Sequence, residues 1–121
     1  MYREHDPIRD ERILNEAIVD CYDEDEERMG WYYYMTDNLT LPIAAKVRFP
    51  MKGGQTEVRP AQIVEVDPKT EQGGVVRLGV TEGDSQRVQH ISPEYLVSMA
   101  TTPENAQVIN DWLYWHNHPM L

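Results

Sequence analysis

The chain has 121 residues and a formal net charge of −10 at pH 7, a length that fits one domain with a modest core. Eleven acidic residues and three Arg lie in residues 1–27, so this segment carries −8 and the other 94 residues carry −2. This charge excludes nucleic acid and an anionic membrane surface as natural partners, and it favours cations or the basic face of another protein.

An amphipathic helix is predicted to begin at about residue 7. Asp6 is typical of an N-cap, and proline, here Pro7, is tolerated at the first helical position. The apolar positions fall on one face at helical spacing: Leu14, Ala17, Ile18 and Cys21. A ridge of carboxylates is expected within roughly 60° on the opposite side: Glu16, Asp20, Asp23 and Glu27. Gly30 is predicted to stop or kink this helix.

An aromatic block, residues 31–34, follows an acidic run at residues 23–27. The block has no clean period, so it fits either a short second helix or an extended segment. Asp37 and Asn38, followed by Pro42, are predicted to form a turn. Aromatic side chains of this kind are usually core material, and buried tyrosine hydroxyls need hydrogen-bond partners.

The second half of the chain is predicted to form short strands. Gly/Asp-rich turns separate the five candidates, and one tight helical turn at residues 92–96 precedes the last strand. Together they predict a small SH3-like β-barrel, closed or nearly closed. The expected strands lie at residues 43–49, within 57–67, and at 75–80, 86–91 and 97–99.

A C-terminal helix is predicted at residues 102–117, with Thr102 as its cap and Pro103 in the first turn. Its apolar stripe would close one end of the barrel. The expected fold class is therefore α+β in a single domain, residues 1–121. Its parts are an acidic helical part with the aromatic block at 1–40, a β-barrel at 41–100 and the C-terminal helix.

The acidic run and the oxygen-rich residues after the aromatic block suggest a hard cation. Calcium takes six to eight oxygen ligands in irregular geometry. Helix carboxylates together with a turn would meet that demand, although a run of five carboxylates is more often only a solvated surface. The candidate calcium ligands are Asp37, Asn38 and Thr40 from the turn, and Glu16, Asp20 and Asp23 from the helix.

An EF-hand is excluded by the spacing. Asp23, Asp25 and Glu27 occupy the first three alternate ligand positions of such a loop. The sixth position, however, holds Arg28 where a glycine is needed, and the twelfth holds Tyr34 where a Glu is needed. Any calcium site is therefore of another kind.

Other functions have weaker support. His116 and His118 have the spacing of a transition-metal pair, but no third ligand is near in sequence. There is no glycine-rich phosphate loop or nucleophile elbow, and Cys21 on the apolar helix face is expected to be buried and inert, so we expect no enzyme. No apolar run reaches the length of a membrane span and no export signal is visible, so a cytoplasmic location is expected.

The chain resembles the small acidic calcium-binding proteins described in cyanobacteria, the CcbP family. The resemblance rests on Gly-Trp-Tyr-Tyr-Tyr at 30–34, on Asp37 and on Leu-Thr-Leu-Pro at 39–42, with support from residues 12–20 and the acidic run. It implies a cytoplasmic buffer that sequesters calcium and influences differentiation signalling. It also implies that Asp37 is the key carboxylate and that exposed acidic clusters supply a second, weaker site.

Two functions are therefore carried forward. The first is calcium binding without an EF-hand. The alternative is an SH3-like interaction module that docks a basic protein partner through its acidic face. An affinity that falls steeply with salt but does not respond to calcium would favour the alternative.

Overall fold

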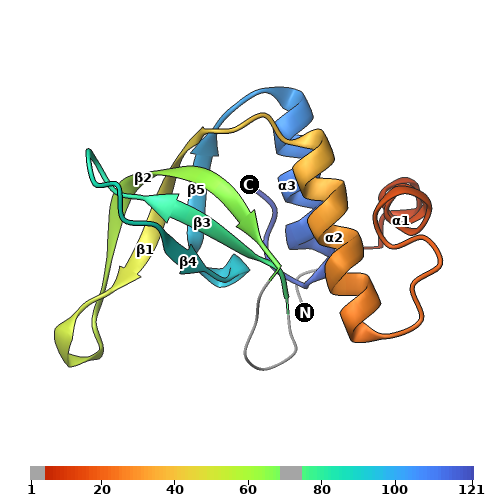
Figure 1. Ribbon diagram of the computed structural model, residues 1–121, viewed down its shortest axis with the longest axis horizontal. Helices are drawn as coiled ribbons and strands as arrows, with labels where there is room; N and C mark the ends of the chain where they lie inside the picture. Colours follow the sequence, from red (N-terminus) through yellow and green to blue (C-terminus); the bar gives the residue numbers. More distant parts are fainter. Residues whose placement is uncertain (1–4, 69–74) are drawn as a thin grey trace.

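In the computed structural model the helices lie together on one side of the molecule and the sheet lies on the other (Figure 1). The structure describes residues 5–68 and 75–121. The fold is α+β, as predicted, with three α-helices and a five-stranded antiparallel sheet. The helices are α1 (Pro7–Arg12), α2 (Glu24–Asn38) and α3 (Pro103–Trp115), and the strands are β1 (Ile43–Pro50), β2 (Thr56–Asp67), β3 (Arg77–Thr81), β4 (Gln89–Ile91) and β5 (Leu96–Ala100).

The prediction of one long N-terminal helix is wrong in the extent of that helix. Its start is confirmed, because Asp6 Oδ1 accepts a hydrogen bond from the Arg9 amide at 3.0 Å and Pro7 takes the first position. After α1 the chain makes a π-helical segment, Ile13–Ala17, and then leaves the helix. Asp20 has a φ of 56°, and Asp23 begins α2 as its N-cap. The carboxylate ridge therefore does not form, because its members belong to three different segments.

Gly30 neither stops nor kinks a helix, since it lies inside α2. A Cβ at this position would stand 2.5 Å from the Ala17 carbonyl oxygen and 3.2 Å from Cys21 Sγ. Glycine therefore lets α2 pack directly against the end of the π-helical segment. The aromatic block is helical, with Trp31 and Tyr34 buried and Tyr33 exposed.

The sheet has the order β4-β3-β2-β1-β5 with antiparallel pairing throughout. Burial alternates along β1, as expected for a strand with one face on the core. The predicted strands are confirmed, although β4 is shorter than expected, and the tight turn is present as a 3-10 turn at Pro93–Tyr95. The predicted barrel is not confirmed. Among the described residues, β4 and β5 stand at opposite edges of an open sheet.

The C-terminal helix is confirmed, and the Thr102 hydroxyl caps it by accepting a hydrogen bond from the backbone N–H of Asn105 at 3.2 Å. Its apolar stripe is fully buried: Val108, Ile109, Trp112 and Leu113. α3 packs beside α2, as Figure 1 shows. The stripe and the inner face of the sheet thus share one core.

A buried carboxylate joins the three helices. Asp111 on α3 has no exposed surface and accepts hydrogen bonds from Arg9 Nη1 and Tyr34 Oη, the latter at 2.8 Å. Arg12 binds it with two donors, Nε at 2.9 Å and Nη2 at 2.6 Å. Burial, and then the bond to Asp111, raise the pKa of Tyr34, so its hydroxyl stays a donor. These contacts fix α1 and the middle of α2 onto α3.

Candidate functional site

The six predicted ligands fall into two groups at opposite ends of α2. Asp37 and Asn38 are in its last turn and Thr40 lies just beyond it, whereas Asp23 is its N-cap. Asp20 and Glu16 precede Asp23 in the loop and the π-helical segment. At 1.5 Å per residue, Asp23 and Asp37 are about 21 Å apart along the helix axis. One ion cannot bind both groups, so they are two candidate sites.

The C-terminal end of α2 favours a cation. The predicted turn at Asp37 and Asn38 is in fact the last turn of the helix, where unpaired carbonyl groups and the helix dipole create negative potential. No basic residue lies in this turn, and both side chains are exposed. Asn38 Nδ2 donates to the Tyr34 carbonyl at 2.8 Å, which leaves Asn38 Oδ1 as an oxygen ligand.

The segment after this end is held by Asn105. The side-chain amide of Asn105 makes two hydrogen bonds to Thr40. Its Oδ1 accepts from the Thr40 backbone N–H at 2.9 Å, and its Nδ2 donates to the Thr40 carbonyl at 3.0 Å. Asn105 is buried and also donates to Thr101 Oγ1 at 2.8 Å. Asn105, which the sequence reasoning missed, therefore fixes the backbone at Thr40. The sequence did carry a signal, because this Asn lies at helical spacing on the apolar stripe of α3.

At the N-terminal end of α2, part of the acidic run stabilises the helix itself. Asp23 Oδ1 accepts from the Glu26 amide at 2.8 Å, and Glu26 Oε2 accepts from the Tyr22 amide at 2.7 Å. Asp25 pairs with Arg28 at 2.8 Å. Negative side chains in the first turn are also favoured by the helix dipole. Part of the acidic run is therefore explained by its role in capping and stabilising α2. The remaining carboxylates of the run are exposed or half-buried.

Within residues 5–68 and 75–121 no three His, Cys, Asp or Glu side chains converge on a point where a metal ion would be held. Glu16, Asp20 and Asp23 thus stay predictions, without a shared cage in this arrangement. On β2, the carboxylates of Glu65 and Asp67 face His90 Nε2 at 2.9 and 3.6 Å. None of the helices in the described part is long and apolar enough to span a bilayer.

The chain matches known proteins over nearly its whole length. The crystal structure of Anabaena CcbP is 28% identical, aligns over 95% of this chain and 94% of that chain, and has a TM-score of 0.83. A calcium-binding protein solved in its calcium-binding form is also 28% identical, with coverage of 93% and 92% and a TM-score of 0.75. No protein with a curated description matches the chain. A family model described as calcium binding, CcbP, matches residues 11–116, so the chain belongs to the CcbP family of calcium-binding proteins.

Proposed function

We propose that this protein binds calcium at the two ends of α2, with the stronger site at the C-terminal end, and acts as a cytoplasmic calcium buffer. Membership of the CcbP family supports calcium as the ligand. The observation that carries the stronger site is the last turn of α2, which combines Asp37 and Asn38 Oδ1 with the negative end of the helix dipole and has no basic residue. The backbone at Thr40, held by Asn105, gives this site a fixed wall.

The N-terminal end supplies a weaker site by the same reasoning. Its carboxylates repel one another, and calcium would lower that repulsion without needing a closed cage. Asp20, Asp23 and Glu16 belong to this diffuse site. Because some of these carboxylates already accept backbone hydrogen bonds, calcium competes with the capping of α2. We therefore expect the N-terminal site to bind calcium with a lower affinity than the site at Asp37.

Calorimetric titration with calcium, repeated with magnesium, tests the proposal. Asp37→Asn should remove the tightest calcium site and leave the weaker binding, whereas Asp84→Asn, an exposed carboxylate in the loop between β3 and β4, should leave the titration unchanged. Calcium at 100 times its dissociation constant should stabilise the fold by about 2.7 kcal/mol. For 121 residues this raises the melting temperature by about 10 °C. Full retention of the tight site in Asp37→Asn would refute the assignment.

The buffer role also predicts that calcium does not change the secondary structure of the protein. A buffer binds calcium without a change of fold, unlike a sensor that opens on binding. Far-UV circular dichroism should therefore be the same with and without calcium. A large change in helix content would instead favour a signalling switch.

Docking of a basic partner remains the second candidate. It is supported by the exposed acidic turn at the start of α2 and by Tyr22, which is 86% exposed beside it. A cationic peptide probe should then bind more weakly as salt rises, with no response to calcium at matched ionic strength. A response to calcium alone would favour the first function.

A further inference from the structure

A groove of about 720 Å³ lies between the N-terminal helical segment and the end of α3. On the N-terminal side it is lined by Pro7, Asp10, Glu11 and Leu14, whose spacing of i, i+3, i+4 and i+7 is that of one helix face. Trp115 lines it from α3. Figure 1 shows α1 on the side of the molecule away from the sheet, so the sheet does not cover this face. We call this surface the α1 groove.

The α1 groove has an apolar floor that the core of the protein does not use. No residue of α1 is buried. Leu14 is 51% exposed, whereas Ile13 beside it in the chain is completely buried. Leu14 therefore points away from the core and lines the groove together with Pro7 and Trp115. Apolar surface that is rimmed by polar groups in this way marks a site of interaction with another molecule.

The rim of the α1 groove carries negative charge that the chain leaves largely uncompensated. Glu11 is exposed and has no ion pair within residues 5–68 and 75–121. Asp10 faces His5 Nδ1 at 3.2 Å, and His5 is the only side chain among the described lining residues that can carry positive charge. The arginines of α1, Arg9 and Arg12, are bound to the buried carboxylate on α3. α3 and the residues after it contain no Lys or Arg. The groove therefore attracts cationic side chains.

We propose that the α1 groove docks a basic amphipathic helix of a protein partner. An apolar side chain of the partner packs on Leu14 and Trp115, and a lysine or arginine beside it pairs with Glu11. An acidic partner would be repelled, and a metal ion would gain nothing from the apolar floor. The α1 groove is a different surface from the acidic turn at the start of α2, and docking there does not depend on calcium binding at Asp37.

The test is an NMR titration of the methyl-labelled full chain, with calcium held at a constant saturating concentration. The probe is an amphipathic peptide of about 14 residues, built from Leu and Lys at helical spacing. It should shift the methyl resonances of Leu14 saturably, and Leu14→Met identifies these resonances. The control peptide has the same composition in an order that forms no apolar face. It should bind at least about tenfold more weakly, because it cannot cover the apolar floor.

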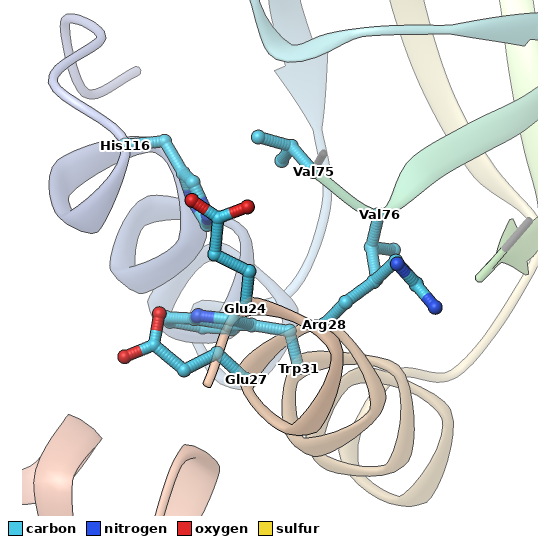
Figure 2. A pocket seen from close by; sticks show the side chains of 7 residues that line it. All are labelled: Glu24, Glu27, Arg28, Trp31, Val75, Val76 and His116. Atoms are coloured by element: carbon cyan, nitrogen blue, oxygen red, sulfur yellow. The ribbon is translucent and has the colours of Figure 1, made fainter. Parts of the chain in front are cut away.

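Two pairs of variants, measured by calorimetry, separate the groove from the rest of the acidic surface. Leu14→Ala should weaken peptide binding by about tenfold, whereas Val19→Ala, at a site that is 53% exposed outside the groove, should leave it within about twofold. Glu11→Lys should weaken binding by about tenfold or more, because it brings like charges together. Glu24→Lys makes the same change in net charge in a separate pocket beside Trp31 (Figure 2) and should leave binding within about threefold.

Four results would overturn the proposal. No saturable shift of the Leu14 methyl groups means that the groove takes no helix. Equal binding of the two peptides means attraction by charge alone. Weaker binding in Glu24→Lys but not in Glu11→Lys assigns docking to the acidic turn of α2. Leu14 shifts that grow with protein concentration in the absence of peptide assign the groove to a second copy of the chain. The first, second and fourth results use the unmodified chain, so they hold even if a variant fails to fold.

Discussion

Substitution of Asp111 by Asn should destabilise the fold more than any exposed charge change. The carboxylate has no exposed surface and faces the guanidinium groups of Arg9 and Arg12, whose side chains are 19% and 21% exposed. Removing one partner of a buried ion pair costs about 3–5 kcal/mol. Because the arginines reach some solvent, we take the lower end, about 3 kcal/mol. With an unfolding entropy of about 0.25 kcal/mol/K for 121 residues, the melting temperature falls by about 12 °C.

Thermal unfolding followed by far-UV circular dichroism measures this loss. Asp84→Asn changes the net charge equally at an exposed position and should move the midpoint by no more than about 2 °C. Tyr34→Phe removes one of the hydrogen bonds to Asp111, about 1 kcal/mol, and should lower the midpoint by about 4 °C. If Asp111→Asn unfolds within about 4 °C of the parent protein, the buried carboxylate does not join the helices as argued.

Two further substitutions test local packing and protonation. Gly30→Ala should lower the melting temperature, because the added Cβ would stand 2.5 Å from the Ala17 carbonyl oxygen. This clash should outweigh the helix preference of alanine over glycine, which is about 1 kcal/mol. A more stable variant would contradict the close approach of α2 to Ala17. Burial lowers the pKa of His116 in the folded protein below its ordinary value of 6.5. Below about pH 6.5 the unfolded chain therefore takes up a proton that the folded chain does not. The free energy of unfolding then decreases as the pH falls towards the folded pKa. His116→Gln should remove this part of the loss when melting is compared at about pH 7 and about pH 5, and an unchanged pH profile would show that His116 does not contribute.

The elements that could be predicted from sequence are those whose signals are local. α3 has a cap, a proline in its first turn and one apolar stripe, and each of these requires only neighbouring residues. The strands have alternating or apolar patterns between turn residues, so their positions followed as well. Closure of the sheet depends on whether β4 meets β5, which no local pattern encodes, and the barrel prediction was not confirmed for that reason.

The N-terminal half shows why helical spacing alone is insufficient. Apolar positions continue at helical spacing through residues 14–21, but the chain leaves the helix after Ala17. Asp23 then caps a new helix, because its carboxylate accepts a hydrogen bond from the Glu26 backbone amide. An Asp can sit on an exposed helix face or cap a helix, and spacing does not distinguish the two. Asp111 posed a similar problem, since its arginine partners lie 102 and 99 residues away in sequence. An acidic residue next to an apolar stripe is a signal of burial, but it does not identify the partner.

The length of α2 decides how the carboxylates can act. The sequence placed six candidate ligands within 25 residues, which suggested a single cluster. The structure separates them by about 21 Å, which exceeds the Debye length of about 8 Å at physiological ionic strength. Charge neutralised at Asp37 would therefore hardly be felt at Asp23, so the two proposed sites should fill independently. Calcium uptake over a wide concentration range, without cooperativity, is the behaviour that suits a buffer better than a switch.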